Sequence, residues 1–435
     1  MERAIQASQG AIQAVPPGRL VSLTVTLPGV AINADHRPGI TLGSDCRWLT
    51  PDEDHALYGT GEALRLALSE PDGFEAHRAA WTVLDDGTGP APVAFWAVPP
   101  ALEPSPPTLW VPRVLLWRHT ERTTLTVSLR RDATPVAEMA PRWLADARAL
   151  VAGYTRRGLP SIAARAPGCS IGSWTDRVRR TTDAIAAGRI AKAVLARRLR
   201  IDLTEAADPQ GLADRLADLH PSCCTFALPH GGGHVVAASP ERLAVKRGAR
   251  VVSTALAGTA PRHTSSEADA RAAADLLASP KERREHAIVA DAIAEALGEV
   301  CETVERPDMP GIMRLRQVQH LWTPVTGRLR PGAGLLDVVT RLHPTPAVVG
   351  WPRQAALEWL RMMNEDRDGL YTGVAGWIDH NGDGEAAMVL RSAFIDDRSA
   401  VLWAGAGIMA ESDPIHEWAE IDMKLSTMLN LFGEP

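Results

Sequence analysis

The sequence predicts an α+β protein whose sheets are largely antiparallel. Segments of strand character are joined in pairs by short turns rich in glycine, asparagine and aspartate, which is typical of β-hairpins. Helical and strand-like segments also follow one another without the regular alternation of a parallel α/β fold. With 435 residues, the chain is long enough for one large domain or for two or three average ones.

The composition is that of a globular protein. The chain is 45% hydrophobic and 23% charged, which argues against a largely disordered state. Its 46 Lys and Arg residues are outnumbered by 52 Asp and Glu residues, and the net charge of -6 argues against a nucleic-acid partner, which would require a basic surface. No run of about 18 apolar residues occurs, so we expect no membrane-spanning helix.

The cysteines and the N-terminus favour a cytoplasmic protein. The five cysteines contain no C-x-x-C pair, so neither a zinc ribbon nor a disulfide framework is predicted, and a reducing compartment fits best. The first residues, MERAIQASQGAIQAV, lack the continuous apolar core of a signal peptide.

The N-terminal part, residues 1–150, is predicted to be rich in strands. The segments 21–27, 109–117 and 123–129 alternate apolar and polar residues or are rich in β-branched residues. The helical signal is weak between residues 15 and 151. We therefore expect this part to consist mainly of strands and turns.

From about residue 173 the sequence mixes strong helices with strands. Residues 177–190 are predicted to form a helix that ends near Gly188, and residues 191–201 to form a strand. The remaining predicted elements are hairpins with turns at 230–234 and 380–385, helices on either side of Pro280, and a final helix over 413–431.

Lys192 and Glu241 are candidates for proton transfer. Lys192 begins the apolar strand AKAVLA, where it shares a face with Val194 and Ala196. Burial there would favour the neutral amine, which can act as a base, although a lysine at a strand end can also extend its ammonium group to the surface. Glu241 follows a strand in ASPERL, where a carboxyl can act as an acid at the edge of a cleft, or can begin a helix capped by Ser239.

Two helices carry glutamates that are candidate metal ligands. Glu285 lies at the head of the apolar stripe of its helix and faces the interior, where a carboxylate must be paired or bind a metal. Glu417, Glu420 and Lys424 share one face of the final helix, for which a solvated row of ion pairs is the alternative. Oxygen ligands alone favour Mg²⁺ over zinc.

Arg391 is a candidate for binding an anionic group. We expect it to lie inside the apolar strand VLRSAFI, which is an unusual place for a surface arginine. The AGAGIM segment that follows contains Gly405 and Gly407, whose backbone N–H groups no side chain covers. Together these groups would form a clamp for a carboxylate.

Taken in order, the segments of the second region resemble the chorismate-utilising synthases, and within them isochorismate synthase. The resemblance covers residues 173–433 and is highly specific, because many blocks occur in family order. The blocks are KAVLAR (192–197), ASPERL (238–243), ALAGTAPR (255–262), K-x-x-x-E-H (281–286), VQHLWTPVTGRL (318–329), LHPTPAVVGWP (342–352), YTGVAGW (371–377), GDGEAAMVLRSA (382–393), AGAGIMAESDP-x-x-EWAE (404–420) and KLSTML (424–429).

The resemblance implies the family fold, in which two large and mainly antiparallel β-sheets pack together and are flanked by helices. It implies that residues 173–433 form the chorismate-binding catalytic domain, and that residues 1–150 form a divergent, strand-rich part of the same fold. It further implies a cytoplasmic isomerase that converts chorismate to isochorismate with Mg²⁺ as cofactor. Such an enzyme would act as a monomer without a glutaminase subunit.

The resemblance also implies roles for single residues. Lys192 would be the base that activates water for attack on C2 of chorismate, and Glu241 the acid that protonates the departing C4 hydroxyl. Mg²⁺ would be held by Glu285 and Glu420, with Glu417 as a water-mediated partner. The residues implied in substrate binding are Gly258, Thr259, His320, Tyr371, Arg391, Gly405, Gly407 and Lys424.

Two positions indicate water as the nucleophile. Lys192 stands where members that use ammonia, such as anthranilate synthase, carry Gln, and Ala257 stands where aminodeoxychorismate synthase carries a nucleophilic Lys. Salicylate synthases share the lysine but differ in the 342–352 block. A salicylate synthase, which would also eliminate pyruvate, and a catalytically silent chorismate-binding protein are the alternatives. The product would enter siderophore, salicylate or menaquinone biosynthesis.

Three places depart from the family pattern. His263 follows the GT-x-PR block where the family has Gly, and Trp351 replaces the second Gly of the 342–352 block. Asp368 stands where the family has Arg in R-G-x-Y, and Arg367 lies one place earlier. These positions are expected to border the pocket, so they bear on rate and selectivity rather than on the acid, base and metal positions.

Overall fold

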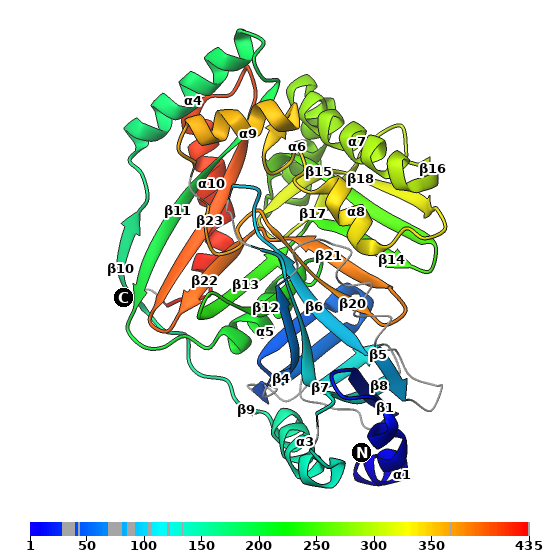
Figure 1. Cartoon of the computed structure of the whole chain (residues 1–435). Helices are drawn as coiled ribbons and strands as arrows, with labels where there is room; N and C mark the ends of the chain where they lie inside the picture. The colour runs from blue at the N-terminus through cyan, green and yellow to red at the C-terminus, as the bar shows by residue number, and fades with distance from the viewer. Residues whose placement is uncertain are drawn as a thin grey trace.

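The structure is a computed structural model that describes residues 1–27, 40–41, 44–67, 81–84, 92–102, 106–119, 122–132, 134–365 and 367–433 (Figure 1). The strands are β1 (Leu20–Thr26), β2 (Ile40–Thr41), β3 (Cys46–Thr50), β4 (His55–Ala67), β5 (Trp81–Leu84), β6 (Val93–Val98), β7 (Thr108–His119), β8 (Arg122–Arg130), β9 (Tyr154–Thr155), β10 (Ile162–Pro167), β11 (Lys192–Leu203), β12 (Cys224–His230), β13 (Gly233–Ser239), β14 (Arg242–Arg247), β15 (Arg250–Pro261), β16 (Cys301–Glu305), β17 (Gly311–Arg314), β18 (Val318–Leu329), β19 (Gly350–Trp351), β20 (Val374–Asp379), β21 (Gly384–Met388), β22 (Ser392–Asp396) and β23 (Ser399–Ile408). The helices are α1 (Glu2–Ala14), α3 (Val136–Ala152), α4 (Ile171–Ala186), α5 (Pro209–Leu219), α6 (Ser266–Ala278), α7 (Pro280–Val300), α8 (Leu335–Leu342), α9 (Arg353–Met362) and α10 (Pro414–Leu429), with a 3₁₀ turn η1 at Pro51–Glu53.

The main strands pair into two long runs that share β7. One run follows the order β10-β11-β23-β22-β13-β12-β3-β4-β7. The other continues from β7 through β6-β20-β21-β14-β15-β18. Every pair in both runs is antiparallel, whereas β1 and β5 pair in parallel. The predicted α+β fold with mainly antiparallel sheets is therefore confirmed.

Helices cover the outer faces of the two runs (Figure 1). Helix α7 packs on β15 and β18 with α8 beside it, and α10 packs against β23 and α4. Helix α9 packs against β11 and β19, and α1 pairs with α3 near the N-terminus. Among the described residues, no helix is both long and apolar enough to cross a membrane.

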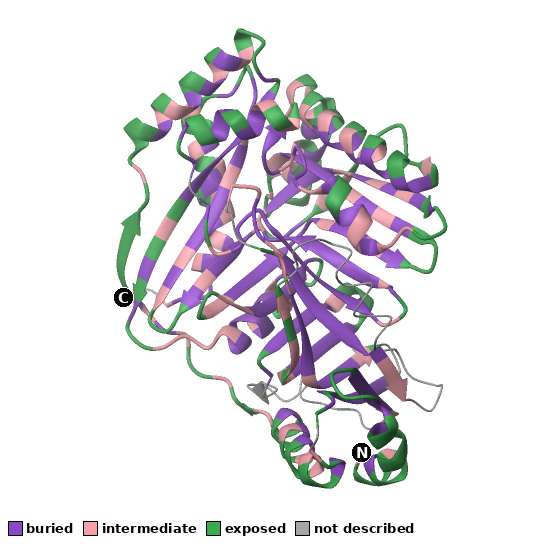
Figure 2. Ribbon diagram, in the orientation of Figure 1, coloured by how far each residue is buried: buried purple, intermediate pink, exposed green. Residues whose placement is uncertain are grey.

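The buried residues gather between these layers, and the exposed residues lie mostly on the outer faces of the helices (Figure 2). The largest core contains Val289 and Ile293 of α7, which confirms the predicted inward stripe of that helix. An aromatic core of strand residues includes Trp48 and Trp377. Burial of apolar area at about 25 cal/mol per Å² makes these layers the main source of stability.

The second region matches the predicted order of elements. The hairpins β12–β13 and β20–β21, the break at Pro280 and the closing helix α10 all lie where the sequence predicts them. The N-terminal part differs, because α3 is a helix in a region where the helical signal is weak. Pro141 lies inside α3 and weakens its local helical preference, while burial of Trp143 and Leu150 stabilises the helix through tertiary packing.

The start of β11 is held by the short strand β19. The N–H of Ala191 donates to the carbonyl of Trp351 at 2.8 Å, and the N–H of Val194 donates to the carbonyl of Val349 at 3.0 Å. Gly350 has a φ of 121°, and a Cβ at this position would collide with the carbonyl oxygen of Lys192. Glycine therefore permits the close approach that places Lys192 at the strand start.

Candidate active site

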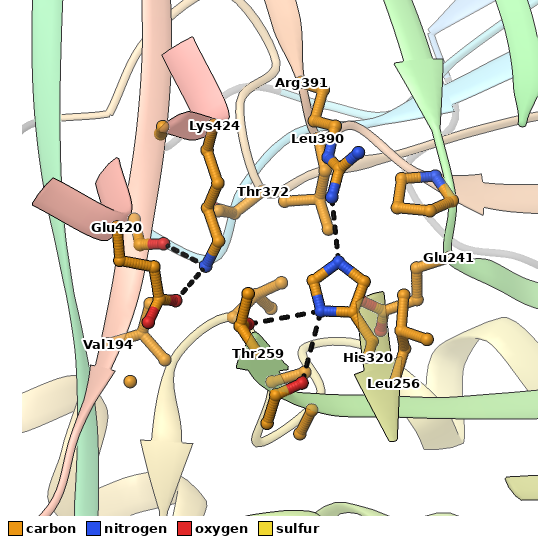
Figure 3. Close-up of a pocket in the computed structure, with 18 of the residues that line it drawn as sticks. Val194, Glu241, Leu256, Thr259, His320, Thr372, Leu390, Arg391, Glu420 and Lys424 are labelled. Atoms are coloured by element: carbon orange, nitrogen blue, oxygen red, sulfur yellow. Dashed lines mark hydrogen bonds and ion pairs between the residues drawn. The ribbon is translucent and has the colours of Figure 1, made fainter. Parts of the chain in front are cut away.

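A single cavity brings together the candidate residues from distant parts of the chain (Figure 3). It encloses about 720 Å³ including its open mouth, which is the size of a site for a small organic molecule. The predicted site residues that line it are Lys192, Glu241, Gly258, Thr259, Glu285, His320, Tyr371, Arg391, Gly405, Gly407, Glu420 and Lys424. Glu417 is buried close by and is not part of the lining.

Glu241 lies in the connection between β13 and β14, so the alternative of a helix beginning at this residue is wrong. Its side chain is 2% exposed, and burial raises its pKa to about 8 against the opposing effect of Lys192. The carboxyl is therefore mostly protonated at neutral pH. The hydroxyl of Thr345 donates to Oε1 of Glu241 at 3.5 Å, which is at the limit of a hydrogen bond.

Lys192 is 1% exposed, so its ammonium group does not reach the surface. Its Nζ lies 2.9 Å from Oε1 of Glu285, and this ion pair accounts for a buried charge that would otherwise be costly. Gly407 of β23 leaves the space for this contact. A Cβ at Gly407 would collide with Oε1 of Glu285 and would lie 2.8 Å from Cε of Lys192.

The glutamates of α7 and α10 lie in the first two turns of their helices. Each helix has proline at its first position and a capping side chain before it: Ser279 accepts from the N–H of Glu282, and Asp413 accepts from the N–H groups of Ile415 and His416. Carboxylates close to such N-termini are favoured by the helix dipole. Glu285 of α7 and Glu420 of α10 both line the cavity.

Lysines compensate these carboxylates. Nζ of Lys424 lies 2.7 Å from Oε1 of Glu420, and Nζ of Lys281 lies 3.2 Å from Oε1 of Glu417. Burial and the neighbouring Glu420 raise the pKa of Glu417, whereas Lys424 holds the pKa of Glu420 below its usual value despite burial. Because Glu417 is 1% exposed, the alternative of a solvated row of ion pairs is wrong.

The glutamates do not form a ready-made metal cluster. In the part of the chain that the structure describes, no group of three or more His, Cys, Asp or Glu side chains stands close enough to hold a metal ion. The chemistry of the donors nevertheless suits a hard divalent cation, because the donors are carboxylates. Glu420 raises the pKa of the neighbouring Glu417, so the two carboxylates repel each other when both are ionised.

His320 connects Arg391 to the irregular part of β15 around Gly258. Its Nε2 accepts from the Arg391 guanidinium at 2.8 Å, so Nδ1 carries the proton and donates to the carbonyl of Gly258 at 3.2 Å. Thr259 Oγ1 lies 3.2 Å from the same Nδ1. Burial and the charge of Arg391 hold the pKa of His320 well below its ordinary value, so the ring is neutral.

Arg391 is not inside a strand, which corrects the prediction. It lies between β21 and β22 with a φ of 47°, in the left-handed region, because Leu390 N–H bonds back to Met388 O at 2.9 Å and interrupts the strand. The strained backbone turns the buried guanidinium into the cavity. Figure 3 shows it above His320.

Gly405 lines the cavity with its backbone. The ammonium of Lys424 donates to its carbonyl at 2.9 Å, on the side away from β11. A strand residue directs its N–H and C=O to the same side, so the Gly405 N–H also faces away from β11. Tyr371 approaches the same residue, since a Cβ on Gly405 would lie 2.8 Å from the tyrosine hydroxyl. Burial raises the pKa of Tyr371 to about 12, which keeps that hydroxyl protonated.

Sequence reasoning missed several residues around the cavity. Lys281 and Thr345 lie within quoted sequence blocks, but only the fold shows that they pair with Glu417 and Glu241. Thr372 and Val348 also lie within such blocks and line the cavity, but neither residue type pointed to a role there.

Comparison with known proteins identifies the family of this chain. A profile described as "Chorismate binding enzyme" matches residues 102–433, which is most of the chain. This chain belongs to the chorismate binding enzyme family. The matched range includes all of the predicted site residues.

Individual relatives of this family member are isochorismate synthases. The chain is 34% identical over 74% of its length to isochorismate synthase MenF of Bacillus subtilis, of which the match covers 69%. It is 39% identical over 59% of its length to the salicylate biosynthesis isochorismate synthase of Pseudomonas aeruginosa, and spans about half of that relative (53%). The structure superposes on the menaquinone-specific isochorismate synthase MenF of Escherichia coli with a TM-score of 0.81 at 24% identity, covering 99% of both chains, which shows a shared fold.

Proposed function

We propose that this protein is an isochorismate synthase, which adds water at C2 of chorismate and removes the C4 hydroxyl. The observation that carries the proposal is that two buried groups, the carboxyl of Glu241 and the amine of Lys192, line the same cavity. Burial also raises the pKa of Glu241 to about 8, which suits an acid. Water is a poor nucleophile and hydroxide a poor leaving group, so the reaction needs a base and an acid placed around one ring. The names of the curated relatives support the same activity.

In the proposed reaction, the chain supplies both proton transfers. Lys192 is paired with Glu285 as an ammonium in this structure, and it acts as a base only after it has released that proton. The amine then accepts a proton from the water that forms the new bond at C2. The ring double bonds shift, and Glu241 gives its proton to the C4 oxygen, which departs as water. At the end of the turnover Lys192 is protonated and Glu241 is ionised. The proton on Lys192 returns to Glu241 before the next cycle. Atoms and charge therefore balance.

The remaining polar groups would orient a dicarboxylate. The Arg391 guanidinium and the Gly405 backbone N–H, which line the same cavity, would offer donors to the enolpyruvyl carboxylate. Tyr371 adds a protonated hydroxyl on the same side. Neutral His320 and Thr259 would border the ring without adding charge. This arrangement would fix one ring orientation relative to the acid and the base.

We also propose that the enzyme requires Mg²⁺, held by Glu285 and Glu420 with Glu417 reached through water. The carboxylates fit such an ion because each forms an ion pair with a lysine, and a bound cation would take the place of the lysine charge. Bound Mg²⁺ would offset charge around the ring carboxylate of the substrate.

The decisive experiment is incubation of the purified protein with chorismate and Mg²⁺, followed by chromatography of the products. Isochorismate as the main product supports the proposal. Salicylate with an equal amount of pyruvate would instead indicate a salicylate synthase, and calorimetric binding of chorismate without any product would indicate a silent binding protein. The pathway that receives the product, for a siderophore, salicylate or menaquinone, would follow from the neighbouring genes.

A further inference from the structure

We propose that Arg367 is a positioning residue that ties together three pieces of the cavity wall. This inference rests on the proposed function, because it concerns the same cavity. Arg367 does not line the cavity, and its side chain is fully buried behind it. Its place in the chain is one residue before the position where the family pattern has arginine.

Each arm of the Arg367 guanidinium reaches a group that belongs to the cavity wall. Nη2 donates to the carbonyl of Val194 at 2.6 Å, and Nη1 donates to the carbonyl of Val348 at 2.6 Å and to the hydroxyl of Thr372 at 3.2 Å. All of these acceptors come from residues that line the cavity, although they lie on segments far apart in the sequence. Charged donors make these bonds stronger than neutral ones.

The three segments are those that carry the proposed chemistry. Val194 is two residues from Lys192 on β11. The bond from Arg367 to the carbonyl of Val194 therefore holds the strand that carries the proposed base. Val348 lies in the loop that contains Thr345, the hydroxyl that donates to Glu241. Thr372 follows Tyr371 directly and has a φ of 65°, a strained conformation that its surroundings must enforce.

A buried carboxylate holds the guanidinium in place. Oε2 of Glu365 lies 3.8 Å from Nε of Arg367 and also accepts from the N–H of Ala196 on β11 at 3.2 Å. Glu365 is paired on its other oxygen with Arg177 of α4. Arg367 is thus the middle of a buried network that joins α4, β11 and the cavity wall. Its rigid fork suits several acceptors at once, which a lysine ammonium cannot match.

The geometry leads to a specific expectation for Arg367→Met. This change keeps a similar side-chain length but leaves the carbonyls of Val194 and Val348 without their donor. The wall segments should then separate, so KM for chorismate should rise by about tenfold or more, since small displacements in a site can cost about 100-fold. Arg367→Lys should recover part of the loss because it keeps the charge and one donor.

Arg47→Met is the matched control. Arg47 is also fully buried and pairs with a carboxylate, Asp214. Its hydrogen-bond partners include Gln210, Asp214 and Ser44, none of which lines the cavity. Its loss should reduce thermal stability as much as the loss of Arg367, while KM stays at the wild-type value. KM is the useful readout because it does not depend on the fraction of protein that is folded.

Amide hydrogen exchange gives a second readout that does not depend on activity. In Arg367→Met, exchange should accelerate in the segments around Val194 and Val348, and it should not do so in Arg47→Met. Unchanged KM and unchanged exchange in those segments would overturn the proposal, and if Arg367→Met does not fold, the same comparison is made with Arg367→Lys. If the wild-type protein does not convert chorismate, the proposed function fails, while the exchange comparison still tests Arg367.

Discussion

The ammonium of Lys192 and the carboxylate of Glu285 form a buried ion pair, with Nζ 2.9 Å from Oε1. The proposed base and the proposed metal ligand are therefore in direct contact before any cation binds. This contact is possible because Gly407, beside both side chains, has no Cβ that would collide with Oε1 of Glu285 and crowd Cε of Lys192. A substitution at Lys192, Glu285 or Gly407 should therefore alter the contacts of the other two residues.

The Lys192→Gln variant should lose hydration while still binding chorismate. Glutamine keeps similar bulk but cannot accept a proton, and removal of a general base costs about 10²- to 10⁴-fold in rate. The rate of isochorismate formation and the calorimetric dissociation constant for chorismate are the measurements. Lys246→Gln removes another largely buried lysine, paired with Asp383 at 2.9 Å outside the cavity, and should leave the rate unchanged. A Lys192→Gln rate equal to that of the parent would disprove the assignment of the base.

The Glu241→Gln variant should lose most of its activity, and its remaining kcat/KM should no longer fall at alkaline pH. Since the acid form is active and the pKa is about 8, wild-type kcat/KM should fall as pH rises through 8, and the residual activity of the variant should lack this limb. The folded pKa lies above the unfolded value, so the stabilising contribution of the proton is lost as pH rises from about 4.5 to 8. Unfolding free energies measured across this range should decline more in wild type than in Glu241→Gln.

Glu385→Gln provides the control for that pH experiment. Glu385 is 1% exposed and lies outside the cavity, and its pKa is lowered: burial opposes ionisation, but His55 and Arg247 outweigh it. Its stabilising effect is present above its unfolded pKa and is lost as pH falls, the reverse of Glu241. Glu385→Gln should therefore keep the alkaline limb of kcat/KM. Loss of the limb in both variants would show that Glu241 is not its source.

The Glu285→Gln variant should need more Mg²⁺. Removal of one negative ligand should raise the Mg²⁺ concentration for half-maximal activity by at least about tenfold, the lower end of what supporting residues of metal sites contribute. Calorimetric titration of Mg²⁺ into the protein without chorismate checks the same change independently of turnover. Glu295→Gln alters an exposed glutamate of the same helix and should have no effect. Identical Mg²⁺ titrations for Glu285→Gln and wild type would remove Glu285 from the ligand set.

The Gly407→Ala variant should lose activity while remaining folded. The added Cβ would collide with Oε1 of Glu285 and crowd Cε of Lys192, and both are ends of flexible side chains that can move apart. Thermal unfolding should change little, whereas kcat and Mg²⁺ affinity should both fall. Gly298→Ala is the control, because nothing lies within 4 Å of a Cβ there and alanine is favoured in a helix by about 1 kcal/mol. Full activity in Gly407→Ala would show that the Lys192 and Glu285 contact is not needed.

Local patterns in the sequence determined the α+β class, the hairpins and the glutamate-bearing helices. The turn chemistry at 230–234 and 380–385 and the proline at the start of α7 act through neighbouring residues, so they can be read from short segments. Residue blocks that resemble a known family then identified the candidate site residues. In the structure, all but one of these residues line one cavity.

The tertiary structure alone decided which groups face one another. Helix α3 forms despite Pro141 because Trp143 and Leu150 are buried, and Arg391 enters the cavity from a left-handed turn rather than from a strand. The pairing of Lys192 with Glu285, and of Arg367 with Val194 and Val348, joins segments far apart in the chain. Such contacts depend on how layers pack, and packing is a property of the whole fold that no short segment encodes.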